Sequence, residues 1–387
     1  MVRSIAAIDA ALDRAVSDNN VPGIVAMAAD RDKVFYTRAV GTMGVDNDAP
    51  MPIDAIHRIF SMTKPIGTLA AVKLIEDGML ELDTPVSEIL PDFAELLVLE
   101  GFDGDTPIMR APASQATIRQ LATHTSGLEF ETWSAKIARY LEITGQPSIR
   151  TGLLESLKYP LSFDPGTSWG YGPSTDWLGR VVEKVSGKPI DVFCREFLFE
   201  PLGMNDTVFE CVQRSRLVTA HSRDKTGALM ALDIEPPPNP EFYGMGRALF
   251  STAPDYMRFL QMLLGKGTLD GVRILKPETV AVVCENHMGN VEIPPMNSTD
   301  QFLSADLDFL PGIAKRWGLG FASNTEDIPG MRAAGSQSWA GILNTHMWWD
   351  PTKGVAGVIF MQNIPFLEDT AMQIYRDFER AVYASGL

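Results

Sequence analysis

The sequence predicts an α/β (α+β) protein, in which one mostly antiparallel sheet is flanked by N- and C-terminal helices and carries an inserted, mainly helical subdomain. Each end of the chain has the pattern of a helix together with a β-hairpin, and the middle has the pattern of helices joined by Pro/Gly loops. The 387 residues, 45% hydrophobic and 21% charged, are enough for a large core. This composition excludes a disordered chain, collagen and a disulfide scaffold.

The N-terminal end predicts a helix followed by a hairpin. Apolar side chains recur at helical spacing at Ile5, Ile8, Leu12 and Val16. Apolar runs then lie on both sides of a polar turn at residues 30–32, which is typical of two paired strands.

The C-terminal end repeats these elements in reverse order. Residues 338–362 predict strands around a turn at residues 350–354, and residues 368–385 predict an amphipathic helix. Because both ends supply a helix and strands, the economical arrangement is a single sheet that is built from both termini.

The middle of the chain predicts helices, each of which ends near a glycine. These helices are expected at residues 65–78, 117–127, 175–187 and 190–203. We therefore expect a sheet domain made of residues 1–80 and 235–387, a mainly helical subdomain of residues 81–234, and an active site between them. Residues 95–115 and the proline-rich residues 233–246 are expected to be surface loops.

Charge and cysteine usage limit the partners and the compartment. With 33 Lys and Arg against 49 Asp and Glu, the net charge is −16, which argues against nucleic acid as a partner. Three cysteines form no paired framework, and no apolar run reaches the roughly 20 residues of a membrane span. The N-terminus lacks the long apolar stretch of a secretory signal. We expect a cytoplasmic protein without a membrane span, and the sequence leaves its oligomeric state open.

Neither a metal nor an organic cofactor is predicted. The five histidines show no metal-binding spacing, and neither a Rossmann nor a P-loop glycine pattern occurs.

Ser61 and Lys64 carry the strongest chemical signal, because they open a strongly apolar segment as Ser-Met-Thr-Lys. A spacing of three residues on a helix makes the hydroxyl and the amine neighbours. A serine needs a base to become a nucleophile, and a buried lysine that loses its charge can be that base. The N–H groups at a helix N-terminus favour the oxyanion that forms in acyl transfer.

On its own this tetrapeptide also fits an N-cap serine with a solvated lysine one turn later. A second copy, Ser222-Arg223-Asp224-Lys225, lies among charged residues before Thr-Gly and is interpreted as an exposed turn.

The rest of the chain resembles the serine β-lactamase-like and penicillin-binding-protein-like hydrolases, especially their esterase branch, the family VIII carboxylesterases. Segments similar to those of the family follow in the family's order from about residue 20 to 380. They are GMLELDTPVSEILP, ATIRQLATHTSGL, FDPGTSWGYG, VVEKVSGKPI, FEPLGMNDT and LFSTAPDYMRFLQMLLGKG. The resemblance implies a β-lactamase-like fold, with Ser61 as the nucleophile, Lys64 as its base partner and Tyr171 as the catalytic tyrosine that shuttles protons. Without the resemblance, Tyr171 would be read as a half-buried aromatic residue with a wet hydroxyl.

A third block, Trp339-Ala340-Gly341, matches the W-G-G of the esterase branch with one substitution. The resemblance implies that the backbone N–H of Trp339 joins that of Ser61 in an oxyanion hole. The alternative is a plain core hairpin, since tryptophan-rich strands are usually packing.

Two departures from the β-lactamase pattern concern the substrate. Pro173 replaces the asparagine of Y-x-N, and the lysine of K-T-G is absent. Both changes favour small neutral esters, so we expect a carboxylesterase with at most weak β-lactam turnover.

Several alternatives stay open at this point. Gly166-Thr167-Ser168-Trp169-Gly170 spells the nucleophile elbow of α/β-hydrolases, but its flanks are neither strand nor helix, so Ser168 is the second candidate nucleophile. The same scaffold also permits an acyltransferase, an amide or D-peptide hydrolase, or a non-catalytic module that binds β-lactams or peptidoglycan fragments.

Overall fold

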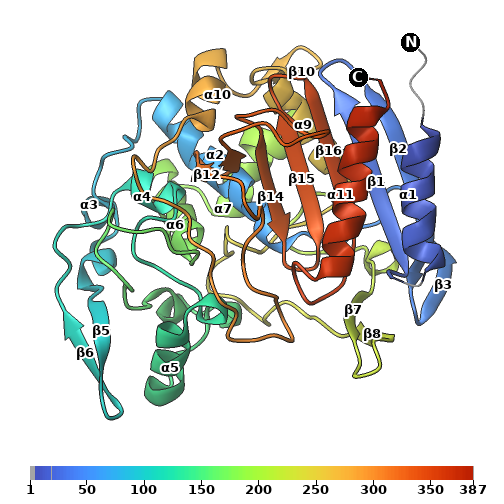
Figure 1. Cartoon of the computed structure of the whole chain (residues 1–387). Helices are drawn as coiled ribbons and strands as arrows, with labels where there is room; N and C mark the ends of the chain where they lie inside the picture. Colours follow the sequence, from blue (N-terminus) through green and yellow to red (C-terminus); the bar gives the residue numbers. More distant parts are fainter. Residues whose placement is uncertain (1–4, 19, 387) are drawn as a thin grey trace.

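The structure, a computed structural model, describes residues 5–18 and 20–386. Its centre is an eight-stranded sheet with the strand order β12-β13-β14-β15-β16-β1-β2-β3, in which every neighbouring pair is antiparallel (Figure 1). The strands are β1 (Gly23–Asp30), β2 (Val34–Gly44), β3 (Asn47–Pro50), β12 (Lys315–Trp317), β13 (Ala322–Asn324), β14 (Gln337–Gly341), β15 (Thr345–Asp350) and β16 (Val355–Phe360). The expected β-lactamase-like architecture, with one sheet built from both ends of the chain, is confirmed.

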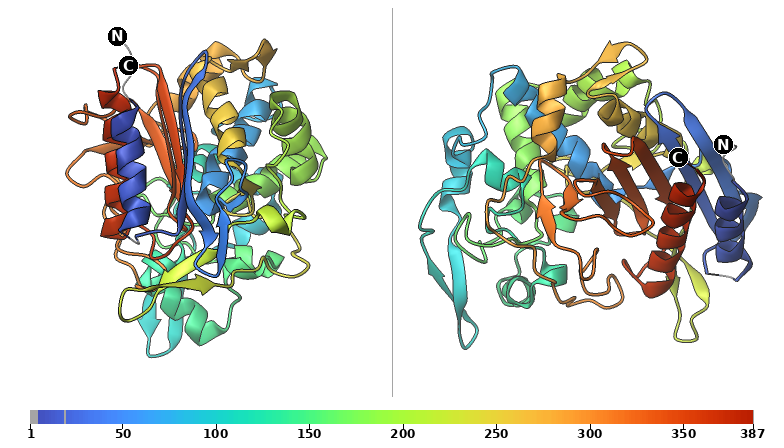
Figure 2. Two further views of the ribbon diagram at one scale, coloured as in Figure 1. Left: turned by 90° about the vertical axis from the view of Figure 1, so that its right-hand side faces the viewer. Right: turned by 45° about the horizontal axis from the view of Figure 1, so that its top comes forward.

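The sheet lies between two layers of helices (Figure 2). Helices α1 (Ala6–Ser17) and α11 (Asp369–Ala384) pack side by side on one face, and α9 (Ala253–Leu264) covers the other face against β1, β15 and β16. The predicted helical spacing explains this packing, because the apolar stripes of α1 and α11 turn inward. Their buried residues include Ile8, Leu12, Met372, Ile374 and Phe378.

Both predicted terminal hairpins are present. β1 and β2 pair on either side of residues 31–33, and β15 and β16 pair around residues 351–354. The central join of the sheet is β1 with β16, from Val25 opposite Phe360 to Asp30 opposite Val355. The first and last strands of the chain therefore meet in the middle of one core.

The middle of the chain supplies most of the remaining helices. They are α2 (Thr63–Glu76), α3 (Val86–Ile89), α4 (Ile118–Ala122), α5 (Ala135–Thr144), α6 (Ser174–Ser186), α7 (Ile190–Cys194), α8 (Glu200–Leu202) and α10 (Pro277–Cys284). α2 is buried along almost its whole length and packs against α6. The predicted domain boundaries, 1–80 with 235–387 and 81–234, stay a proposal that this packing does not test.

The expectation of a surface loop at residues 95–115 is wrong. The chain there forms a hairpin of β5 (Val98–Asp103) and β6 (Thr106–Arg110). The two strands are joined by Gly104 and Asp105, and Gly104 has a φ of 58°; a glycine at the first position of a two-residue loop is typical of a hairpin connection. Arg110 ties the hairpin down through ion pairs with Glu100 and Asp164. By contrast, residues 233–246 contain no helix or strand, as the prolines predict.

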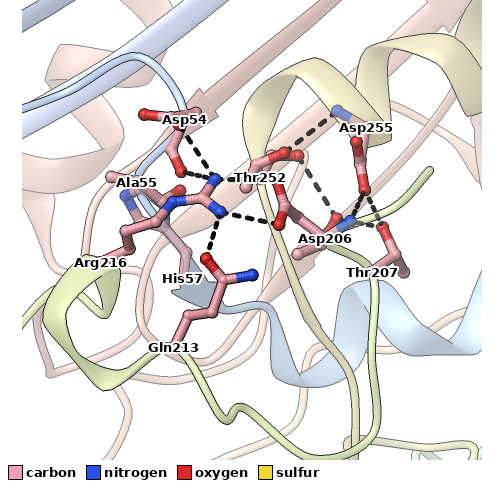
Figure 3. A network of polar contacts seen from close by, with 10 residues as sticks. Asp54, Ala55, His57, Asp206, Thr207, Gln213, Arg216, Thr252 and Asp255 are labelled. Atoms are coloured by element: carbon pink, nitrogen blue, oxygen red, sulfur yellow. Dashed lines mark hydrogen bonds and ion pairs between the residues drawn. The ribbon is translucent and has the colours of Figure 1, made fainter. Parts of the chain in front are cut away.

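Short strand pairs and polar contacts fix the chain segment just before Ser61, which leads into the candidate site. β4 (His57–Arg58) pairs with β9 (Phe250–Ser251), and the smaller hairpins are β7 (Ala220–Arg223) with β8 (Leu229–Leu232) and β10 (Thr268–Leu269) with β11 (Val272–Arg273). Beside β4, Arg216 binds both carboxylate oxygens of Asp206 and the backbone carbonyl of Asp54 (Figure 3). Asp255 accepts a hydrogen bond from the Asp206 backbone N–H at 2.8 Å. Segments far apart in sequence are thus joined just before Ser61.

Within the described residues, no helix is both long and apolar enough to cross a membrane.

Candidate active site

Ser61 lies in a sharp turn that leads into the buried helix α2. The turn is a 3-10 helix, η1 (Phe60–Met62), and Phe60 adopts a φ of 40°, a left-handed conformation that is uncommon for a bulky residue. The turn leaves the Ser61 side chain partly exposed, whereas Lys64, in the first turn of α2, is 1% exposed. The hydroxyl of Ser61 is therefore accessible, whereas the amine of Lys64 beside it is buried.

The Lys64 amine touches Ser61 and is held by a backbone carbonyl. Its Nζ lies 3.0 Å from Ser61 Oγ and donates a hydrogen bond to the Gly246 carbonyl at 2.8 Å. It also lies over the rings of Tyr171, at 4.6 Å from the centroid, and Phe130, at 5.1 Å. Burial lowers the pKa of Lys64 to about 7, so a large share of the amine is neutral at neutral pH and can accept the serine proton.

The Tyr171 hydroxyl is the third group at this point. It accepts a hydrogen bond from Trp339 Nε1 at 3.2 Å, and the Ser61 side chain is near enough to lower its pKa. Burial raises the pKa of Tyr171, although the bonds from Ser61 and Trp339 oppose that rise. The phenol is therefore protonated at neutral pH and is available as a proton donor.

Five aromatic side chains pack near the ring of Tyr171. Their centroids lie 5.0 to 6.1 Å from that of Tyr171, and they belong to His124, Phe130, Trp133, Trp169 and Trp339. This packing fixes the phenol ring and keeps its surroundings poorly hydrated.

The block Trp339-Ala340-Gly341 forms the end of β14, beside the nucleophile turn. η1 packs against β14, and a Cβ placed on Gly341 would come within 2.3 Å of the Ile59 carbonyl oxygen. β13 pairs with β14 only at Gln337 and Ser338, so the three-residue block extends beyond that pairing. The structure thus brings the third predicted block next to Ser61, and its role as an oxyanion hole stays a prediction.

The second candidate nucleophile lies in a different setting. Ser168 lies in a loop with no strand before it, and the next helix begins only at Ser174, so the G-x-S-x-G sequence does not form a nucleophile elbow. The downstream histidines lie elsewhere, since His287 contacts Arg119 and His346 stacks on Tyr375. The other S-x-x-K, residues 222–225, runs from a strand into the β7–β8 hairpin turn.

Sequence reasoning missed four groups around Lys64 and Tyr171. They are the Trp339 indole, the Gly246 carbonyl, and the side chains of Asp176 and Arg247. One signal could have pointed to Asp176, because this residue is a carboxylate on the face of α6 that otherwise carries core residues. Across residues 5–18 and 20–386, no three His, Cys, Asp or Glu side chains lie close enough together to hold a metal ion.

Comparisons with known proteins identify the family and the fold of the chain. The sequence model of the Beta-lactamase family matches residues 8–381. The lovastatin esterase of Penicillium rubens is 31% identical over 396 residues, covering 97% of this chain and 98% of the esterase. The monacolin J acid methylbutanoyltransferase of Aspergillus terreus is 30% identical, covering 97% of this chain and 95% of that enzyme. The unliganded structure of the simvastatin synthase LovD of Aspergillus terreus superposes with a TM-score of 0.85 at 29% identity, over 99% of this chain and 98% of that one.

Proposed function

The chain belongs to the Beta-lactamase family and is a serine hydrolase or acyltransferase of that fold, and from this premise we propose that it cleaves small carboxylic esters through an acyl-enzyme on Ser61. The resemblance inferred from the ordered motifs is confirmed at the family level. The observation that carries the proposal is the 3.0 Å contact between Lys64 Nζ and Ser61 Oγ inside a buried, aromatic site.

The first step is attack by Ser61 on the ester carbonyl. Lys64 takes the hydroxyl proton as the Oγ–carbon bond forms, which its pKa of about 7 permits. The backbone N–H groups of Ser61 and Trp339 are assigned to the oxyanion, because β14 runs beside the turn that holds Ser61.

The second step releases the alcohol. Tyr171 lies near Ser61 and keeps its proton at neutral pH, so it gives this proton to the departing alkoxide. The proton held by Lys64 restores the phenol. Water then attacks the acyl-enzyme and releases the acid, with the same two groups moving protons in the opposite order.

Acyl transfer to an alcohol is the second candidate function. The relatives that are about 30% identical over nearly the whole chain include both an esterase and an acyltransferase. Both reactions share the acyl-enzyme and differ only in whether water or an alcohol accepts the acyl group.

The test uses the purified full-length chain with p-nitrophenyl acetate and butyrate. Ser61→Ala is expected to abolish turnover, whereas Ser168→Ala, as a matched serine control, is expected to keep most of it. A phosphonate probe is expected to add its mass to the peptide that carries Ser61. Loss of activity in the Ser168 variant alone would overturn the assignment.

Product analysis separates the remaining functions. With an added primary alcohol, a transferase yields mainly the new ester and a hydrolase yields mainly the acid. Turnover of anilides or D-peptides above that of esters would replace the ester assignment with an amidase or peptidase. Absence of both turnover and labelling would leave the non-catalytic binding module.

A further inference from the structure

Asp176 is a fully buried carboxylate that is linked to the Lys64 amine through one intervening residue, Gly246. It belongs to the first turn of α6, and its Oδ1 accepts the backbone N–H of Gly246 at 3.1 Å. The carbonyl of the same Gly246 receives Lys64 at 2.8 Å. Asp176 is thus connected to the base through a single residue of an otherwise irregular segment.

The segment that includes Gly246 is shaped around this carboxylate. A Cβ on Gly244 would come within 2.4 Å of Asp176 Oδ1, and a Cβ on Gly246 within 2.6 Å of Oδ2. The two glycines therefore let the backbone pass closer to the carboxylate than any other residue would allow. Between them, the Met245 side chain packs closely against Gly67 of α2 and Gly179 of α6. A Cβ on either of these glycines would lie 2.7 Å from the Met245 side chain.

Two side chains carry the charges that act on Lys64. Arg247 follows the glycine turn, and its positive charge lowers the pKa of Lys64, whereas the negative charge of Asp176 raises it. The other groups that face Lys64 are Tyr171, which is neutral, and His124, whose pKa burial and the Lys64 charge hold well below its usual range. Asp176 Oδ2 has no hydrogen-bond partner in the described part of the chain. Burial raises the pKa of Asp176, whereas the charges of Arg247 and Lys64 and the hydrogen bond from Gly246 favour its ionised form.

We propose that Asp176 is a positioning residue for acyl transfer: it seats the Gly244–Arg247 turn so that the Gly246 carbonyl holds the Lys64 amine against Ser61, and its negative charge opposes the positive charge of Arg247 at that amine. This inference rests on the proposed function, because Lys64 must act as the base. Removing the negative charge makes Lys64 harder to protonate, and removing the positive charge makes it easier to protonate.

The test compares two variants with opposite charge changes. Asp176→Asn keeps a side-chain oxygen for the Gly246 N–H and removes the charge, so the acidic limb of kcat/KM against pH is expected to move to lower pH, by on the order of one unit. Arg247→Met keeps an apolar stem and is expected to move that limb to higher pH. A general loss of stability would not shift the acidic limb in opposite directions in the two variants.

Asp255→Asn is the matched control. Asp255 is also a buried carboxylate in the first turn of a helix, α9, and also accepts a backbone N–H, from Asp206 at 2.8 Å. It is not among the charges that act on Lys64, so its loss is expected to leave the limb in place. The proposal is overturned if the acidic limb of the pH profile stays fixed in both test variants, or if it moves in the same direction in both. If Asp176→Asn does not fold, Arg247→Met decides alone, and an unmoved limb overturns it.

A second readout separates this inference from the proposed function. The ¹³Cε signal of Lys64, assigned with Lys64→Ala, reports the charge of the amine without any substrate. Opposite shifts of its titration in the two variants support the electrostatic role even if no ester is turned over, a result that would contradict the proposed function alone. Normal ester turnover with an unchanged Lys64 titration in both variants contradicts only the role of Asp176 and Arg247.

Discussion

At the residue scale, Trp339 contributes to the site in two ways, one through its backbone and one through its side chain. Its backbone is the predicted oxyanion donor, and its indole, which the sequence reasoning did not consider, donates to the Tyr171 hydroxyl at 3.2 Å. A tryptophan here stands where β-lactamases carry the lysine of K-T-G, so the strand offers an aromatic donor instead of a cation. The residue that argues against β-lactams thereby also contacts the phenol that is proposed to move protons.

Trp339→Phe is expected to lower kcat of ester hydrolysis by about fivefold, because the phenol loses one hydrogen bond that is worth about 1 kcal/mol while the ring packing is largely kept. Steady-state kinetics check this prediction. Trp169→Phe is the matched control, since Trp169 stacks on the same phenol at 6.1 Å but its Nε1 has no partner among the described residues. Equal losses in the two variants would contradict the role of the indole.

Pro173 leads to a prediction about the substrate class. A proline side chain offers no amide to hold a lactam. Pro173 is the residue directly before the helix α6. Nitrocefin is therefore expected to be turned over far more slowly than the best p-nitrophenyl ester. Comparable kcat/KM values for the two substrates would refute the preference for esters.

At the scale of elements, the site depends on how closely β14 approaches the turn before α2. Gly341 is required there because the Ile59 carbonyl occupies the space that a side chain would need. We expect a local displacement at this contact to move the proposed oxyanion donor Trp339 relative to Ser61, while the strand itself stays paired with β15. Activity is therefore more sensitive than the fold to substitutions at this position.

Gly341→Ala is expected to reduce kcat/KM by about a hundredfold, the loss that a misplacement of about 1 Å typically causes, while the circular dichroism spectrum stays unchanged. Gly101→Ala is the control, because Gly101 also lies in a strand and a Cβ there would meet nothing within 4 Å. An unimpaired Gly341→Ala enzyme would show that the spacing of β14 and η1 does not matter for catalysis.

At the scale of the whole molecule, buried neutral histidines make stability depend on pH. Burial lowers the pKa of His57 to about 4, and burial together with the charges of Arg332 and Arg376 lowers that of His346 to about 3. The unfolded chain binds protons at these groups near pH 6.5, while the folded chain does not. Stability is thus fully present above about pH 6.5 and is lost as the pH falls toward the folded values.

His346→Phe is expected to remove part of this loss. His346 stacks on Tyr375 at 4.5 Å, and its Nε2 has no partner in residues 5–18 and 20–386, so a phenyl ring can take its place. Between pH 7 and pH 5 the variant is expected to lose about 2 kcal/mol less unfolding free energy than the parent chain. Urea unfolding at the two pH values measures this difference, and equal losses would contradict it.

The features that the sequence determined by itself are local or repeated along the chain. Helical spacing predicted α1 and α11, polar turns predicted both terminal hairpins, and a spacing of three residues predicted that Ser61 and Lys64 would meet. The Gly-Asp turn of the β5–β6 hairpin was an equally local signal, but the prolines around it concealed the strands.

Only the tertiary structure decided what surrounds Lys64. The carbonyl of Gly246 and the carboxylate of Asp176 are each more than a hundred residues away from it in sequence, as is Trp339, whose indole contacts Tyr171. The types of these residues alone predict packing or turns rather than chemistry. Local spacing fixes which side chains share a turn, because backbone geometry is the same everywhere. Burial and charge depend on contacts between distant segments, so the environment that lowers the pKa of Lys64 exists only once the sheet and the inserted helices have packed together.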